Sequence, residues 1–167
     1  MKQKKKASQV IDSEQALEHW QGHRNLTRRM IDVYPEEKLF TYSIGGMRPF
    51  SELVMEMIHI AGPGVKGLAT GEWEEFGEME DAEGTTVPET KEELLKLWDW
   101  CTDQINRYWP EIEEERFQEE EVAFGQYEGQ IWSHLCYFID NEIHHRGQGY
   151  VYLRSLGIEP PYFWERE

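Results

Sequence analysis

Apolar residues recur at helical spacing in four separate stretches of the chain. In residues 13–33 one stripe of apolar side chains is interrupted by charged residues, whereas residues 50–70 are apolar almost all round, as expected of a helix buried in a bundle. The third stretch covers residues 90–109 and the fourth residues 128–156. Because no segment shows a convincing strand pattern, the sequence predicts an all-α fold, an antiparallel four-helix bundle.

Start and stop signals support these four helices. Ser13 is the expected N-cap of the first helix, and Thr90 with Glu93 forms a capping box that opens the third. Gly157 is expected to close the fourth helix in a left-handed cap, with Ile158 as the hydrophobic residue that follows such a cap.

The remaining segments are expected to be irregular. Residues 36–49 are predicted to be a loop, residues 71–88 an exposed acidic loop, and residues 116–125 irregular with at most a short extended piece. Residues 1–11 are predicted to be a disordered basic tail, followed by one domain over residues 12–167. The C-terminal run Tyr162-Phe163-Trp164 is too apolar for a free end, so we expect it to pack back on the bundle.

The net charge of the chain limits which classes of binding partner are expected. Asp and Glu number 33 against 17 Lys and Arg, which gives a net charge of -16. Such a surface repels a phosphate backbone, so nucleic-acid binding is disfavoured. The basic start is followed by no apolar leader region, and no apolar run approaches a membrane-spanning length, so we expect a cytoplasmic protein without membrane contact. Cys101 and Cys136 are interpreted as buried reduced thiols.

Candidate chemistry lies in the fourth helix. Asn141 and His145 are four residues apart and therefore project from one helix face, where a third ligand from another helix would complete a metal site. His59 is the best candidate for that ligand, although a single histidine on an apolar helix is more often a hydrogen-bonded core residue. His19 and His23 share the same spacing, but the charged residues around them favour a solvent-exposed pair.

His59, the run I-D-N-E-I-H-H-R-G-Q at 139–148 and the ending L-R-S-L-G-I-E-P-P at 153–161 together resemble the DinB/YfiT-like family of metal-dependent bundles. The resemblance implies an up-down-down-up bundle, a homodimer, and a divalent Zn or Ni ion between helices two and four. Carried over by position, the metal ligands are His59, Asn141 and His145. Asn141 stands where the family has histidine, and a neutral amide lowers the affinity for a late first-row metal.

Two functions follow from this resemblance. The first is a metal-dependent enzyme that acts on a small molecule, a thiol-dependent S-transferase using a low-molecular-weight thiol or a related hydrolase. The alternative is a non-catalytic dimeric stress-response or small-ligand binding protein with a degenerate or empty metal site. Arg146 and Gln148 are interpreted as structural residues that tie the fourth helix to its neighbours or to the dimer partner. Glu142 either orients a ligand histidine or faces solvent, and both interpretations stay open.

Overall fold

A computed structural model of the chain describes residues 10–80, 82–84 and 86–167. The long helices are α1 (Ser13–Val33), α3 (Phe50–Thr70), α4 (Lys91–Tyr108) and α5 (Ile131–Ser155). The shorter elements are helix α2 (Glu36–Thr41), the 3-10 turns η1 (Trp109–Glu111) and η2 (Glu114–Gln118), and the strands β1 (Glu120–Ala123) and β2 (Tyr127–Gln130).

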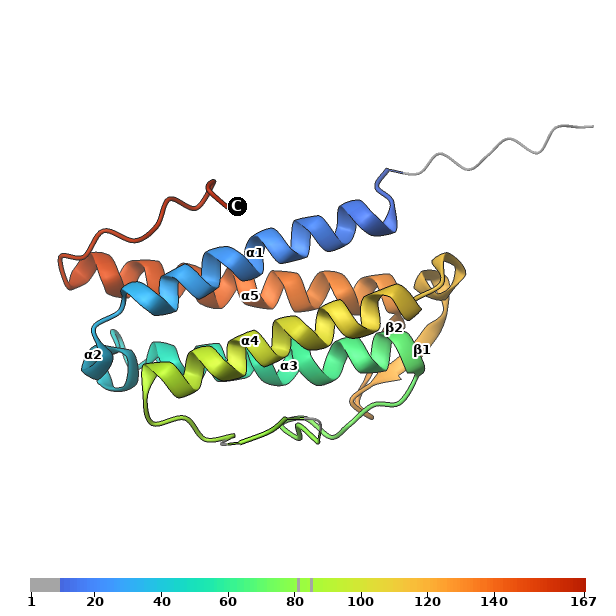
Figure 1. The fold of residues 1–167 in the computed structure, drawn as a ribbon, viewed down its shortest axis with the longest axis horizontal. Helices are drawn as coiled ribbons and strands as arrows, with labels where there is room; N and C mark the ends of the chain where they lie inside the picture. The colour runs from blue at the N-terminus through green and yellow to red at the C-terminus, as the bar shows by residue number, and fades with distance from the viewer. Residues whose placement is uncertain (1–9, 81, 85) are drawn as a thin grey trace, which may run out of the picture.

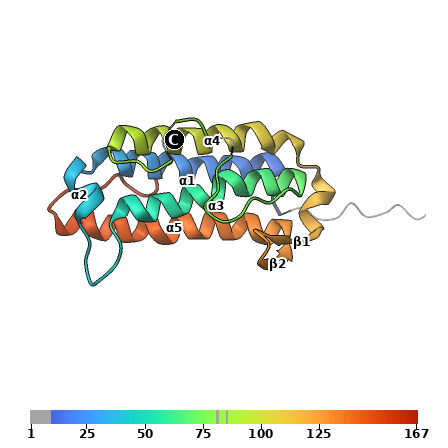
Figure 2. The same cartoon turned by 90° about the horizontal axis from the view of Figure 1, so that it is seen from below.

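The four long helices form the predicted up-down-down-up bundle. In Figure 1, α1 and α5 run in one direction and α3 and α4 in the other. α1 packs against α4 and α5, and α3 packs against the same two helices, so the core lies between two pairs. Figure 2 shows the same arrangement from below. Because α3 and α4 are parallel, residues 71–90 must return along the whole bundle, and this crossover borders the candidate site.

The ends of the long helices agree with the start and stop signals in the sequence, except that the N-cap of α1 lies one residue earlier than predicted. Asp12, not Ser13, is the N-cap of α1, and it forms a capping box with Gln15. Thr90 forms the expected capping box with Glu93 at the start of α4. Gly157 has a φ of 75°, as expected of the residue that ends α5 in a left-handed cap.

Two short elements occupy segments that the sequence predicted to be irregular. α2 lies inside the expected loop, where Glu36 and Glu37 favour a helix start and Leu39 is buried. β1 and β2 form an antiparallel hairpin in which Ala123 pairs with Tyr127. The hairpin takes the first residues assigned to the fourth helix, so α5 begins at Ile131.

A buried ionic cluster joins α5 to α1. The carboxylate of Glu142, only 1% exposed, accepts a 2.6 Å hydrogen bond from Thr27 Oγ1 and lies 3.6 Å from the guanidinium of Arg24. Arg146 donates to Thr27 Oγ1 at 3.2 Å and to the carbonyl of His23 at 3.3 Å. Paired charges of this kind are costly to separate, so the cluster fixes the register of α5 against α1.

His23 is a member of this cluster and not part of a solvent-exposed pair. It is buried, and its Nδ1 accepts from Arg146 at 2.9 Å while its Nε2 lies 3.0 Å from Arg166. Burial and the two nearby guanidinium groups lower the pKa of His23 to about 3, so the ring is neutral at pH 7. His19 is exposed as predicted.

The cysteines differ from each other. Cys101 is fully buried, and burial raises the pKa of its thiol to about 11. Cys136 is exposed, contrary to the prediction of two buried thiols, because it lies on the outer face of α5. Both thiols are free. In the described part of the chain, none of the helices has the length and apolar content needed to cross a membrane.

The C-terminal segment follows α1, as Figure 1 shows, but its aromatic rings stay outside the core. Arg29 donates a hydrogen bond to the carbonyl of Glu165, which attaches the segment to α1. Phe163 and Trp164 are each 63% exposed. The backbone of this end therefore returns to the bundle as predicted, but its aromatic side chains do not pack into the core.

Two glycines of α5 give a test of how closely the helices approach. A Cβ atom at Gly149 would lie 2.5 Å from the ring of Phe50 on α3, whereas a Cβ atom at Gly147 would meet nothing within 4 Å. We expect Gly149→Ala to lower the free energy of unfolding by about 1–3 kcal/mol through overpacking. Gly147→Ala should raise it by about 0.5–1 kcal/mol, because alanine is the better helix former. Urea denaturation of both variants measures the difference, and equal effects would contradict it.

Candidate functional site

Helix α5 presents two pairs of polar residues in two directions. Asn141 and His145 face α3, whereas Glu142 and Arg146, each one residue later, face α1. Successive residues of a helix are about 100° apart, so one pair belongs to the site and the other to the buried ionic cluster. Asn141 and His145 are 8% and 7% exposed, so both side chains are buried in the interface between α5 and α3.

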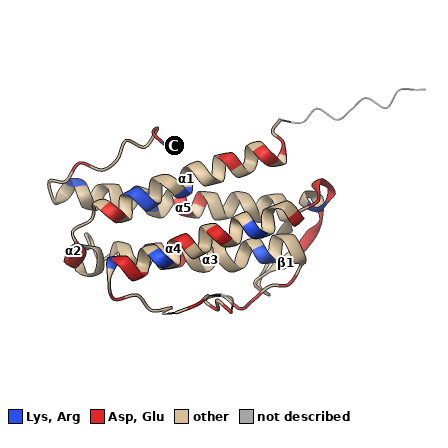
Figure 3. Cartoon of the chain, viewed as in Figure 1, with Lys and Arg blue, Asp and Glu red and all other residues tan. Residues whose placement is uncertain are grey.

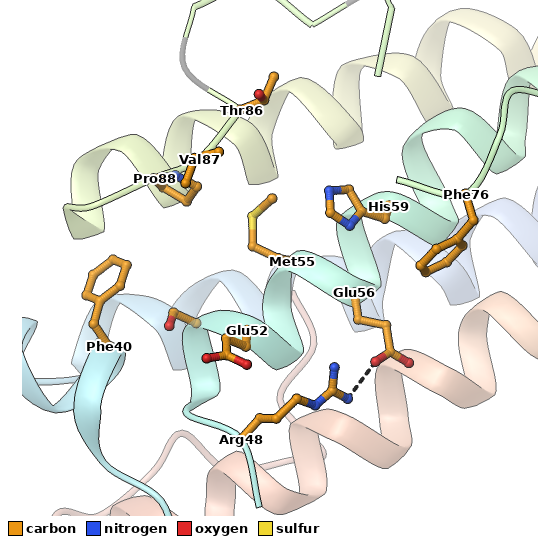
Figure 4. A pocket seen from close by; sticks show the side chains of 11 residues that line it. Phe40, Arg48, Glu52, Met55, Glu56, His59, Phe76, Thr86, Val87 and Pro88 are labelled. Atoms are coloured by element: carbon orange, nitrogen blue, oxygen red, sulfur yellow. Dashed lines mark hydrogen bonds and ion pairs between the residues drawn. The ribbon is translucent and has the colours of Figure 1, made fainter. Parts of the chain in front are cut away.

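The group that Asn141 and His145 meet on α3 is Glu56. Its Oε1 accepts a hydrogen bond from Asn141 Nδ2 at 3.0 Å and lies 2.9 Å from His145 Nε2. Its other oxygen, Oε2, accepts from Arg48 Nη2 at 2.6 Å, the contact drawn as a dashed line in Figure 4. Glu56 is not among the site residues predicted from the sequence. The available signal was that it is the one carboxylate in residues 53–70, a stretch that is otherwise mostly apolar.

His59 lies one turn later on α3 and points elsewhere. In Figure 4 its ring is on the side of the crossover residues Thr86 and Val87, while the carboxylate of Glu56 extends toward α5. The ring is half-buried and lies 6.1 Å from the ring of Phe76, centroid to centroid. Burial lowers the pKa of His59, and the negative charge of Glu56 offsets part of that shift. The structure thus brings Asn141 and His145 together at Glu56, while His59, one turn later on α3, lines the larger cavity that Glu56 also borders.

Electrostatics hold Glu56 ionised. Partial burial alone would raise its pKa, but hydrogen bonds from Arg48, Asn141 and His145 outweigh burial together and lower the pKa to about 2. The carboxylate is therefore negative at any physiological pH, as a metal ligand or an ion-pair partner must be.

The two ring nitrogens of His145 both face oxygen atoms. Nε2 is directed at Glu56, and Nδ1 lies 3.2 Å from Oε1 of Gln148. A carboxylate and an amide oxygen are both acceptors, whereas a neutral imidazole carries only one N–H. A neutral ring therefore satisfies one contact as a donor, and the other is satisfied by a second proton, by a metal ion, or by the Gln148 amide turned through 180° so that its NH2 donates to the ring.

Asn141 adds an unsatisfied acceptor. Its Oδ1 is buried and has no hydrogen-bond partner among the described residues, although a buried carbonyl oxygen normally has one. The donor set between α3 and α5 is thus one carboxylate, one imidazole and one orphaned amide oxygen, all of which are types that bind divalent metals. Nowhere in the described ranges are three His, Cys, Asp or Glu side chains grouped to hold one metal ion, so the amide would have to act as the third ligand.

Two cavities border Glu56. The larger, about 500 Å³, lies between α3, Phe40 of α2 and the crossover residues 86–88 and is drawn in Figure 4. His59 and Met55 line it from α3. The second, about 310 Å³, lies between α3, the hairpin and α5. Glu56 and Phe76 line both cavities, so small molecules in either one would reach the same carboxylate.

The other signature residues have structural contacts. Arg146 ties α5 to α1, in agreement with its predicted role. Glu142 neither faces solvent nor touches a ligand histidine, because it is buried in the ionic cluster of α1 and α5. Gln148 contacts His145 and His144 on its own helix and orients the imidazole of the site.

The direction of the helices and the polar pair on α5 define an up-down-down-up bundle with a site between α3 and α5. The DinB family model matches residues 1–166, and the chain belongs to the DinB family. No curated protein matches the sequence.

Two solved structures share the fold. One is a DinB-like protein from Bacillus cereus ATCC 10987, with a TM-score of 0.65 and 20% identity, covering 89% of this chain and 95% of that one. The other is the DinB-like protein YjoA from Bacillus subtilis, with a TM-score of 0.70 and 19% identity, covering 89% and 97%. At this identity the likeness concerns the fold alone.

The low pKa of Glu56 predicts a pH dependence of stability. In the unfolded chain this carboxyl takes up a proton near its ordinary value of 4.5, whereas in the folded protein it does so near 2. Between these values the unfolded state binds more protons, so the stabilisation from Glu56 is complete above about pH 4.5 and is lost as the pH falls toward 2.

We expect Glu56→Gln to flatten the decline of the unfolding free energy between pH 4.5 and 2, measured by urea denaturation of the metal-free protein at a series of pH values. Glu52→Gln is the matched control, because Glu52 is an exposed carboxylate one turn earlier on α3. It should keep the slope of the unmodified protein. An unchanged slope in Glu56→Gln would show that the ion pair contributes nothing.

Proposed function

We propose that this DinB-family protein holds a divalent metal ion, Zn or Ni, between α3 and α5 and uses it in thiol-dependent S-transfer or a related hydrolysis. Glu56 and His145 are the main ligands, and Asn141 is a weak third ligand through its orphaned oxygen. His59, the α3 ligand expected from the family resemblance, lines the cavity of about 500 Å³ beside the site.

The arrangement of His145 is the observation that carries this proposal. With the Nδ1 proton directed at Gln148, the lone pair of Nε2 would face a carboxylate oxygen 2.9 Å away. A metal ion bound by both atoms would satisfy this arrangement, as would the other tautomer, whose Nε2–H donates to the carboxylate. Histidine ligands of metals are commonly held in this way, with the second ring nitrogen donating to an oxygen.

The larger cavity supplies space for substrates. A bound metal would lower the pKa of a coordinated thiol or water and so provide a nucleophile near neutral pH. The chain itself contributes an apolar wall from Phe40, Met55 and Phe76, which excludes water from a bound substrate. His59 lies on the same wall and, because burial lowers its pKa, it is a neutral base at pH 7.

A second candidate is a non-catalytic small-ligand binding protein whose site holds a proton in place of a metal. The ion pair of Arg48 with Glu56 favours this candidate, because it already neutralises the carboxylate. A doubly protonated His145 would then satisfy both of its acceptors.

Metal titration separates the two candidates. We expect the purified full chain, dialysed against Zn²⁺ or Ni²⁺, to retain about one ion per chain, with elemental analysis as the measurement. Glu56→Gln and His145→Ala should each lose most of it. Asn141→His, which restores the histidine expected in the family, should tighten binding by roughly tenfold or more, because imidazole is a stronger ligand than a neutral amide.

His144→Ala is the control, since His144 is an exposed imidazole beside the site and should not affect retention. His59→Ala distinguishes the two possible ligands of α3. Loss of metal in His59→Ala but not in Glu56→Gln would restore the ligand set expected from the family. Absence of retained metal in the unmodified chain, together with unchanged thermal stability in chelator, would favour the second candidate.

The homodimer is a further proposal that comes from the family resemblance. Trp132, Ile143 and Val151 are exposed apolar residues on α5, which is consistent with a surface covered by a second copy. One chain has a mass of 19.9 kDa. Light scattering after gel filtration should give twice this mass. A single-chain mass at micromolar concentration would contradict the dimer.

A further inference from the structure

The cavity between α3, the hairpin and α5 has a different chemical character from the larger one. It encloses about 310 Å³, which lies in the range of small-molecule sites. Its floor is apolar and buried, with Ile60, Ala123 and Phe138 each no more than 5% exposed. Tyr127 and Tyr137 stand at its mouth and are 58% and 59% exposed. An apolar ligand body would therefore fit the floor and leave a polar end between two tyrosine rings.

Aromatic rings dominate the walls. The ring of Phe124 lies 6.0 Å from that of Phe76 and 6.2 Å from that of Phe138, centroid to centroid, and 5.4 Å from that of Trp73. The faces of such rings carry negative potential and attract cations. The rings thus suit a ligand that is both apolar and positively charged.

The charged residues of this cavity all have one sign. Glu56 and Glu128 line it, and no lysine or arginine does among the described residues. Glu56 is already paired with Arg48, whereas Glu128 is exposed and has no ion-pair partner in the part of the chain that the structure describes. Figure 3 shows further acidic residues along β1 and the crossover. This field repels carboxylates and attracts cations.

The turn of the hairpin places one aromatic ring in the wall of the cavity. Phe124 and Gly125 have φ values of 51° and 67°, and a hydrogen bond from Gln126 N–H to the Ala123 carbonyl closes the turn at 3.1 Å. Positive φ at both central residues is the geometry of a tight hairpin turn. The Phe124 ring, only 7% exposed, lies in the aromatic wall and not in solvent.

We propose that this cavity binds a small organic ammonium ion with an aromatic or alkyl body. The body packs on Phe124 and Phe138, and the ammonium group lies at the mouth between Tyr127 and Tyr137, in the negative field of Glu56 and of Glu128, which borders both this cavity and the neighbouring one beside β1. The site requires no metal ion at Glu56. It therefore stands apart from the metal chemistry proposed above, and either can fail without the other.

The test compares three probes of similar size that differ in charge: 2-phenylethylammonium, 2-phenylethanol and 3-phenylpropanoate. Isothermal titration of the full chain, freed of metal by chelator, measures each affinity. We expect the ammonium ion to bind roughly tenfold or more tightly than the alcohol, with no detectable binding of the carboxylate. Raising the salt concentration should weaken only the binding of the ammonium ion.

Two variants locate the binding. Glu128→Gln should weaken binding of the ammonium probe roughly three- to tenfold and leave binding of the alcohol unchanged, because a charge pair with an exposed carboxylate contributes modestly. Ser133→Trp, at an exposed α5 position that lines the cavity, should fill the space and abolish binding of both probes. Glu120→Gln is the matched control, since it removes an exposed carboxylate from the same hairpin outside the cavity and should change nothing.

Equal affinities for the ammonium ion and the alcohol would overturn the proposal, as would unchanged ammonium binding in Glu128→Gln or in Ser133→Trp. An equal loss in Glu120→Gln and Glu128→Gln would also overturn it, because the effect would then come from net charge alone. Retention of Zn²⁺ by Glu128→Gln, measured separately, shows that the metal site is intact and keeps the two proposals distinguishable.

Discussion

The carboxylate of Glu142 joins three helices in the core. It accepts a hydrogen bond from Thr27 on α1, and the guanidinium of Arg146 on its own helix lies within ion-pair distance. Arg24 of α1, 3.6 Å from the same carboxylate, also reaches the carbonyl of Trp98 on α4. Removing Glu142 would leave the guanidinium groups of Arg24 and Arg146 out of water without a counter-charge, which is among the most costly changes in a protein interior. The rotation of α5 about its own axis is therefore fixed by this cluster.

That rotation positions the candidate site. Asn141 and His145 each precede a cluster residue by one position, so fixing Glu142 and Arg146 toward α1 directs their neighbours toward α3. The result is a second polar contact between helices, at Glu56, in an otherwise apolar interface. One contact is sealed from solvent, while the other borders two cavities. Helix α5 thus carries the structural ionic cluster on one face and the candidate binding site on the neighbouring face.

The bundle was predictable from sequence because its long helices carry a clear apolar period and recognisable caps at Thr90 and Gly157. Shorter elements were not, since the six residues of α2 are fewer than two turns and the hairpin begins in a run of glutamates whose composition resembles a loop. Cys136 was placed inside because neighbouring apolar residues suggested a buried face.

The site was predictable in part. Spacing alone put Asn141 and His145 on one face, which the structure bears out. The identity of the group across from them depends on how α3 is rotated, and an almost uniformly apolar helix gives no periodic signal for that rotation. Histidine chemistry favoured His59 over Glu56 for this reason. Similarly, the charged residues around His23 in sequence gave no indication that one of them, Arg24, belongs to a buried cluster.

The C-terminal segment couples the end of the chain to this interior. Arg166 lies 3.0 Å from His23 Nε2, and its side chain also covers Gly22 on α1. Displacement of this segment from α1 would remove one of the two cations beside the imidazole and admit water to it. The pKa of His23 would then rise toward its ordinary value, while Arg146 and the remaining burial would still lower it. The acid–base behaviour of a histidine near one end of the sequence thus depends on contacts made by residues near the other.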